Sequence, residues 1–209
     1  GVSVVSPVPP VTLVNGLWVE GGDTGSIGGV DDIVATILAG SVTPSNVLFK
    51  DGFERSTVGQ APGTGDPEAG VYTSTGSASA LQVLTGPSFG GPAAAYSGQN
   101  YLVVDRVNSG ERPVLSALLA SGAFPAKSKA FHVEFYRWQP AHVGYGNIVL
   151  GNSPADWGPG YQMLYGISWP EDMSFRSYDG SAYVPTALRF TAEQWDRVEL
   201  DWDGVRCTG

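Results

Sequence analysis

Three acidic residues occupy alternate positions near the C-terminal end of the sequence, at Glu199, Asp201 and Asp203. Apolar residues separate them, and this alternation predicts a half-buried β-strand over residues 196–203. The three carboxylates would then share the solvent-facing side, with the Cα atoms of alternate residues about 6.5–7 Å apart. Carboxyl groups about 5–5.5 Å apart can act as the nucleophile and the acid/base of retaining glycoside hydrolysis. They are therefore candidate catalytic residues, and the alternative is an acidic strand that only faces water.

Carboxylate oxygens are also the ligands that Ca²⁺ prefers, together with backbone carbonyls. Asp51 and Glu54 follow the first strand predicted after residue 46, and Asp201 lies on the last predicted strand. These three residues are the candidate ligands of a structural calcium ion, with Asp203 as an alternative to Asp201. The sequence contains no contiguous Asp-x-Asp-x-Asp-Gly loop, so the alternative is that these acids occupy turns and the surface.

Aromatic residues gather between positions 138 and 183. Their flat faces can stack on sugar rings while nearby polar groups bind hydroxyls. The candidate glycan-binding residues are Trp138, Trp157, Tyr161 and Trp169. Of these, Trp157 and Trp169 fall in loops rich in Pro, Gly, Ser and Asp, where binding residues tend to collect. The alternative is burial, because a β-sandwich core also needs large aromatic side chains.

The composition restricts the class of protein and its partners. Hydrophobic residues make up 42% of the 209 residues and charged residues 15%, which predicts a folded chain with a substantial core. The net charge of −9 argues against nucleic acid as a partner, since phosphate binding needs a basic surface. No apolar run approaches the roughly 20 residues that span a bilayer, so no membrane insertion is expected. The first residue is not Met, and we expect bacterial-type export to a secreted or cell-surface location.

The chain changes character near residue 46. Residues 1–46 are rich in Pro and Gly and predict an extended N-terminal arm, in which residues 31–40 form a short capped helix or a strand. Residues 47–209 alternate strand and turn signals, which is typical of an all-β antiparallel sandwich. The strands expected there are 47–50, 70–74, 80–84, 101–107, 113–119, 130–138, 146–150, 161–167, 172–178 and 196–203.

The longest predicted strand is Phe131–Trp138. Its alternation places apolar side chains on one face and His132, Glu134 and Tyr136 on the other. His132 is interpreted as a surface histidine, because no Gly-x-Ser-x-Gly nucleophile motif accompanies it.

Several segments resemble bacterial concanavalin A-like and laminin G-like domains. They are Val47–Glu54, Val58–Gly63, Asn100–Val104, Phe131–Trp138 and Trp195–Asp203, and together they span roughly residues 47 to 203. The resemblance implies a jelly roll of two curved antiparallel sheets with a concave, often ligand-binding face, and such domains often carry a structural calcium ion. In the family, further strands usually follow the one that ends near Asp203. Here the sequence stops at Gly209, so we expect either a truncated chain or an edge that another chain or the N-terminal arm covers.

The acidic strand is also similar to the Glu-x-Asp-x-x-Glu strand of retaining glucanases with a sandwich fold. Its spacing is one residue shorter, and its last acid is Asp203 rather than Glu. The sequence therefore favours a non-enzymatic, extracellular module that binds glycan or takes part in adhesion. The first alternative is a polysaccharide-active glycoside hydrolase or lyase. The second is a self-assembling surface or filament subunit, which associates through the N-terminal arm or an exposed sheet edge.

Overall fold

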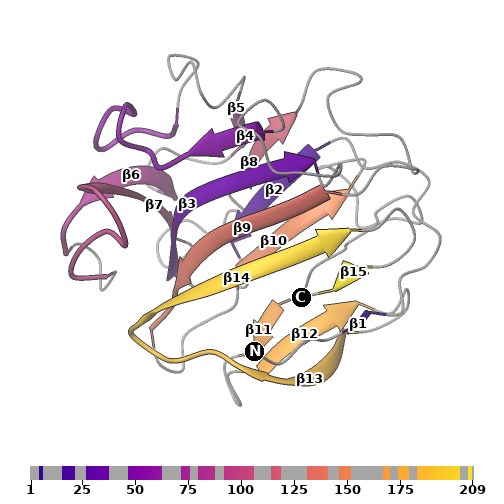
Figure 1. Ribbon diagram of the computed structural model, residues 1–209. Helices are drawn as coiled ribbons and strands as arrows, with labels where there is room; N and C mark the ends of the chain where they lie inside the picture. Colours follow the sequence, from indigo (N-terminus) through magenta and orange to yellow (C-terminus); the bar gives the residue numbers. More distant parts are fainter. Residues whose placement is uncertain are drawn as a thin grey trace.

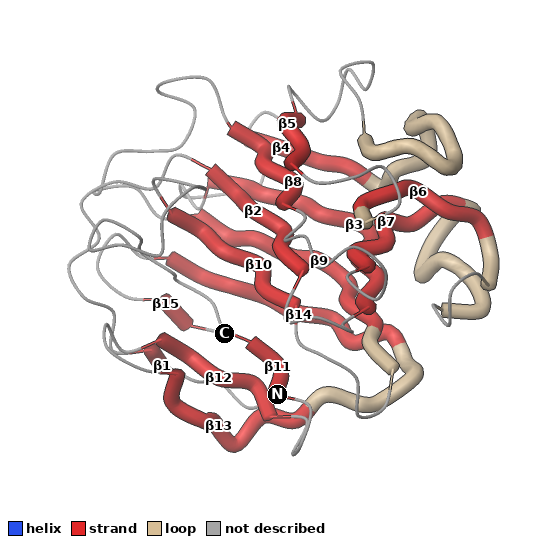
Figure 2. Tube along the Cα trace, turned by 180° about the vertical axis from the view of Figure 1, so that it is seen from behind, coloured by secondary structure: helices blue, strands red, loops and turns tan. Residues whose placement is uncertain are grey.

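The structure is a computed structural model that describes residues 5–6, 16–21, 27–37, 47–62, 72–75, 80–87, 92–105, 114–118, 131–140, 146–151, 167–169, 174–178, 183–202 and 207–208. Within these residues every regular element is a β-strand, and no helix occurs (Figure 2). All the strand pairs described are antiparallel. The predicted all-β class is confirmed.

The described strands form two sheets (Figure 1). The eight-stranded sheet runs β1 (Val5–Ser6), β15 (Cys207–Thr208), β14 (Trp195–Trp202), β9 (Phe131–Trp138), β3 (Ile27–Ile37), β7 (Asn100–Asp105) and β6 (Leu81–Thr85), and β4 (Val47–Asp51) also pairs with β3. The seven-stranded sheet runs β13 (Tyr183–Arg189), β12 (Ser174–Tyr178), β11 (Ile167–Trp169), β10 (Gly146–Gly151), β2 (Gly16–Gly21), β8 (Val114–Leu118) and β5 (Tyr72–Thr75).

Strand β9 shows why the alternating sequence forms a two-faced sheet. Val133 and Phe135 are fully buried, whereas the residues that alternate with them, His132, Glu134 and Tyr136, are partly exposed. Burying an aliphatic or aromatic side chain stabilises the fold by about 1.5–3 kcal/mol. The apolar residues therefore hold β9 in a fixed orientation. We call the opposite face, which carries His132, Glu134 and Tyr136, the outer face of this sheet.

The segment expected to be part of an N-terminal arm lies inside the eight-stranded sheet. Residues 31–40 were expected to form a short helix or a strand, and the structure has the strand β3 over Ile27–Ile37. Strand β3 pairs with β9 on one side and with β7 and β4 on the other. Strand β2 likewise lies between β10 and β8. Both strands thus belong to the same sheets as the strands that follow Val47.

Strand β3 has an irregularity where it passes β9. The register shifts between Asp31 and Val34, and Asp32 has a left-handed φ of 47°. An extra residue of this kind is a β-bulge, which bends the strand and turns a side chain in a new direction. The bulge places Asp31 beside Tyr136 on the outer face, since these residues are directly paired.

Every strand predicted after Val47 overlaps a strand of the structure, although the one predicted at 161–167 shares only Ile167 with β11. Strands β13 and β15 were not predicted. The first of them, β13, has a strand-breaking residue. It contains Pro185, which has no N–H to donate and is confined to edge positions in sheets. Strand β13 lies at the end of its sheet, where that missing donor is tolerated.

Candidate functional site

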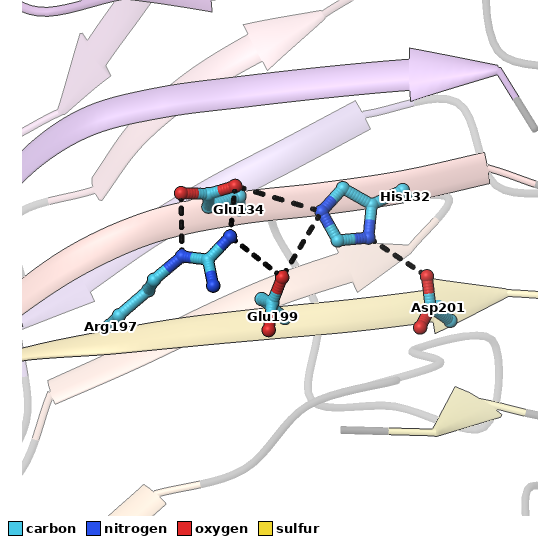
Figure 3. Close-up of polar contacts among 5 residues, drawn as sticks. All are labelled: His132, Glu134, Arg197, Glu199 and Asp201. Carbon is cyan, nitrogen blue, oxygen red and sulfur yellow. Dashed lines mark hydrogen bonds and ion pairs between the residues drawn. The ribbon is translucent and has the colours of Figure 1, made fainter. Parts of the chain in front are cut away.

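The candidate site lies on the outer face of the eight-stranded sheet, where β9 and β14 run side by side. Direct cross-strand pairs join Arg197 to Tyr136, Glu199 to Glu134 and Asp201 to His132. Directly opposite side chains have Cβ atoms about 4.5–5.5 Å apart and point to the same face. Figure 3 shows the resulting row of charged and polar groups. We call His132, Glu134, Arg197, Glu199 and Asp201 the polar row.

Arg197 links the two glutamates of the polar row. Its Nε donates to Glu134 Oε1 at 2.8 Å and its Nη2 donates to Glu134 Oε2 at 2.9 Å, a two-pronged contact. The same Nη2 lies 2.8 Å from Glu199 Oε1 (Figure 3). A planar guanidinium matches a carboxylate in this way and holds it in one orientation.

His132 lies among three carboxylates. Its Nδ1 is 2.8 Å from Asp201 Oδ1, and its Nε2 is 3.9 Å from both Glu134 Oε2 and Glu199 Oε1. The short contact orients the imidazole ring, because one ring nitrogen is held by the carboxylate. The other nitrogen is directed toward the two glutamates (Figure 3).

The electrostatics of the polar row favour charged groups over neutral acids. The hydrogen bonds from Arg197 lower the pKa of Glu134, and the positive charge of Arg197 adds to this effect. The hydrogen bond to Glu134 in turn raises the pKa of Arg197. Glu134 is therefore ionised at neutral pH. A general acid needs the opposite, a carboxyl whose pKa is raised toward the working pH.

An aromatic pair lies at the Arg197 end of the polar row. Tyr96, in the loop formed by residues 92–99, stacks on Tyr136 with ring centroids 3.4 Å apart and planes inclined by 12°. A hydrogen bond with Tyr96, together with burial, raises the pKa of Tyr136 to about 12. Tyr96 itself is 46% exposed, a large fraction for an aromatic side chain. The pair thus presents a ring to solvent beside charged hydrogen-bonding groups.

One group of side chains among the described residues has the spacing of metal ligands. One ligand atom from each of His132, Glu134 and Glu199 lies within 4.8 Å of the others. The positively charged guanidinium of Arg197 already lies 2.8 Å from an oxygen of each glutamate. Its charge repels a second cation in the same position.

The expected calcium ligands do not lie together. Asp201 is on β14, and Asp51 ends β4, with β9 and β3 between them. Three strand spacings amount to about 14 Å, far beyond the reach of one ion. Asp51 Oδ1 accepts the Phe53 N–H at 2.7 Å, and Glu54 Oε1 accepts two backbone N–H groups at 2.8 Å each. A single site containing Asp51, Glu54 and Asp201 is therefore excluded by this arrangement.

The other predicted site residues have mixed outcomes. Glu199 and Asp201 share the outer face, as the alternation predicted, whereas Asp203 lies outside the described residues. Trp138 is only 5% exposed, so this expected glycan-binding ring is buried instead.

The remaining aromatic candidates are not among the residues of the polar row. Trp157 and Tyr161 lie outside the described residues. Trp169 ends β11, where its backbone pairs with Ser174. The candidate site therefore rests on other residues than these.

Several members of the site were not singled out from the sequence. His132, Glu134 and Tyr136 were expected on one face of a strand, but nothing placed them beside Arg197 and Glu199. More than 60 residues separate the side chains that meet across the two strands. Glu134 and Arg197, which are hydrogen-bonded, are 63 residues apart in the sequence. The alternation of polar residues in both strands was the available signal, and the pairing of the strands was not.

No family model matches this chain, and neither a curated protein nor a solved structure matches it. Within the described residues, the structure contains no helix with the length and apolar character needed to cross a membrane.

Proposed function

We propose that this chain is a carbohydrate-binding or adhesion module with a concanavalin A-like jelly roll. The two antiparallel sheets are compatible with that fold, and the segments between residues 47 and 203 that resemble the family support it. A module of this kind is expected to work outside the cell. The ligand would lie on the outer face of β9 and β14.

The observation that carries this proposal is the exposed Tyr96 ring beside the polar row. Sugar rings present an apolar face that stacks on an aromatic ring and hydroxyls that need donors and acceptors. Tyr96 is held against Tyr136, so its orientation is fixed before a ligand arrives. Glu199 and Asp201, with side chains 47% and 54% exposed, supply acceptors that water can reach. Pre-organised groups lose less entropy on binding.

A panel of neutral, amino and acidic polysaccharides, tested by calorimetry and by assay for released products, tests the proposal. We expect saturable binding without products. Replacing Tyr96→Ala should weaken binding by about 3- to 10-fold, as expected for the loss of one aromatic contact. Val58→Ala is the matched control, because Val58 is similarly exposed at 48% but lies on another loop. Unchanged affinity in Tyr96→Ala would refute this location of the site.

A polysaccharide-active enzyme is the second candidate, and the position of the two glutamates favours it. Glu134 and Glu199 are directly paired, and each offers an oxygen within 4.8 Å of the other. This is close to the separation of about 5–5.5 Å found in retaining glycosidases. However, Arg197 holds Glu134 in its ionised form. Product release that is abolished by Glu199→Gln would establish the enzyme in place of the binding module.

A further inference from the structure

Asp31 is a buried acidic residue on the outer face, at the bulge of β3. Its side chain is 0% exposed, although its strand neighbour Tyr136 is partly open to solvent. The loop of residues 92–99 covers it. Asp31 Oδ2 accepts the N–H groups of Tyr96 at 2.9 Å and of Ser97 at 3.1 Å. Asp31 Oδ1 accepts the Asp32 N–H at 2.8 Å. One carboxyl group thus joins the β3 bulge to a loop 65 residues away.

The same loop is held at further points along its length. Trp195 Nε1 donates to the Ala94 carbonyl at 3.0 Å. The Tyr101 hydroxyl lies 2.5 Å from the Gly86 carbonyl and 3.2 Å from the Pro92 carbonyl. Glu54 Oε1 accepts the N–H groups of Gln99, the last residue of the loop, and of Asn100, the first residue of β7. Among these contacts, those of Asp31 lie nearest to the exposed ring, because one of them is to the backbone of Tyr96 itself.

The surroundings of Asp31 disfavour its charged form. Burial is the largest effect and raises its pKa to about 7, and the nearby Asp32 carboxylate adds to the rise. The backbone N–H groups act in the opposite direction but do not outweigh burial. Among the described residues, Tyr136 on β9 is paired with Asp31, Arg197 on β14 is paired with Tyr136, and the N–H of Tyr96 on the loop donates to Asp31.

The thermodynamic consequence concerns the loop. If the loop lifts, Asp31 meets water and its pKa returns toward its ordinary value of 3.8. The seated loop therefore binds the proton more tightly than the lifted loop. By linkage, each pH unit between about 4 and 7 shifts the balance toward the lifted loop by up to about tenfold.

We propose that residues 92–99 form a pH-sensitive cover that is seated while Asp31 is protonated and loosens when Asp31 ionises, which moves Tyr96 away from Tyr136. Asp31 is then a positioning residue for the exposed ring. The consequence for ligand affinity rests on the proposed function, and it predicts weaker glycan binding above pH 7 than below it. The movement of the loop itself does not depend on any ligand.

Amide hydrogen exchange of Tyr96 and Ser97 in the ligand-free protein tests the cover directly. Protection factors, which correct for the intrinsic pH dependence of exchange, should fall by about 100-fold between pH 5 and pH 8. In Asp31→Asn, which has no group to titrate at this position, the protection factors should not change with pH. Glu54→Gln is the matched control. It alters another acceptor of the same segment and should keep the wild-type pH dependence.

A second measurement does not need a variant that folds. The side-chain carboxyl carbon of Asp31 in the wild-type protein should titrate with a midpoint near 7 in carbon-13 NMR. A midpoint near 4, or protection factors that stay constant from pH 5 to pH 8, would overturn the cover. If the protection of the loop changes with pH as expected and no polysaccharide binds, the cover stands and the proposed function fails. If glycan binds and the protection of the loop does not change with pH, the proposed function stands and the cover fails.

Discussion

Arg197 donates to Glu134 through two nitrogen atoms and contacts Glu199 through one of them. Its positive charge therefore stabilises the ionised forms of both glutamates in the polar row. Two carboxylates that face each other on neighbouring strands repel. The guanidinium between them removes that repulsion and fixes both side chains. Because Arg197 and Glu199 are about half exposed, water and salt screen much of the interaction, and its effect is better followed through protonation than through stability.

Arg197→Met should therefore raise the pKa of Glu134 toward its ordinary value of 4.5. The methionine keeps much of the apolar stem and removes the charge and the donors. Carbon-13 NMR of the Glu134 side-chain carboxyl measures the change. Arg197→Lys is the control, since it restores the charge without the two-pronged geometry and should give an intermediate pKa. If Glu134 titrates identically in all three proteins, Arg197 does not lower the pKa of Glu134.

Phe53 allows the effect of backbone strain to be separated from that of packing. It is fully buried, yet it has a left-handed φ of 59°. Phe53→Ala should lower the free energy of unfolding by about 3–5 kcal/mol, since it removes a core ring. Phe53→Gly loses the same ring but relieves the left-handed conformation, which costs other residues about 1–2 kcal/mol. We expect the glycine variant to be the more stable of the two in urea unfolding. The opposite order would show that strain at Phe53 is negligible.

At the scale of elements, the strands of the site were largely predictable and their pairing was not. The alternation of Phe131–Trp138 and of the acidic strand fixes which residues share a face, and both strands occur where they were expected. Their neighbours follow from long-range contacts, which a single strand does not encode. The bulge at Asp31 and Asp32 could likewise not be predicted from the local sequence. These two adjacent acidic residues begin a segment that was expected to be a short helix or a strand, and the partners of Asp31 lie on another strand and a distant loop.

The loop of residues 92–99 depends on Trp195, the first residue of β14. The Trp195 ring meets Tyr101 edge-on, with centroids 5.9 Å apart, and its Nε1 donates to the Ala94 carbonyl. Trp195→Phe keeps an aromatic ring and removes that donor. We expect a loss of about 1 kcal/mol in the free energy of unfolding.

The same substitution, Trp195→Phe, should lower the exchange protection of Tyr96 and Ser97 by a similar factor at pH 5 and at pH 8, because the lost hydrogen bond does not titrate. Hydrogen exchange at the two pH values makes the comparison. A pH dependence that changed along with the protection would mean that Trp195 and Asp31 do not act on the loop independently.

At the scale of the whole molecule, the all-β antiparallel class followed from the frequency of turn residues and of short alternating segments. The division at residue 46 did not correspond to the sheets, because β2 and β3 lie between strands from the rest of the chain. The Pro and Gly content of residues 1–46 indicated irregular backbone. The apolar residues of β3 instead pack into the sheet, and tertiary contacts outweigh local propensity in this way. Val30 and Ile33 are both buried there.

The pH dependence of global stability combines the titrating groups of the whole molecule. Folded Asp31 has a pKa of about 7 against an ordinary value of 3.8, so the folded state binds more protons than the unfolded state between these values. The free energy of unfolding then falls as the pH rises through this range, by up to about 1.4 kcal/mol per unit. Burial also raises the pKa of Asp196, which acts in the same direction. Glu134 acts oppositely, since its lowered pKa gives stability that is lost as the pH falls below its unfolded value.

Asp31 should therefore make the protein about 2–3 kcal/mol less stable at pH 8 than at pH 5. Urea unfolding of the wild type and of Asp31→Asn at both pH values isolates this contribution, because the titrations of Glu134 and Asp196 are common to the two proteins. The wild-type curve should fall more steeply with pH than that of the variant. Parallel curves would mean that Asp31 is hydrated in the folded protein, and the seated loop would then not bury it.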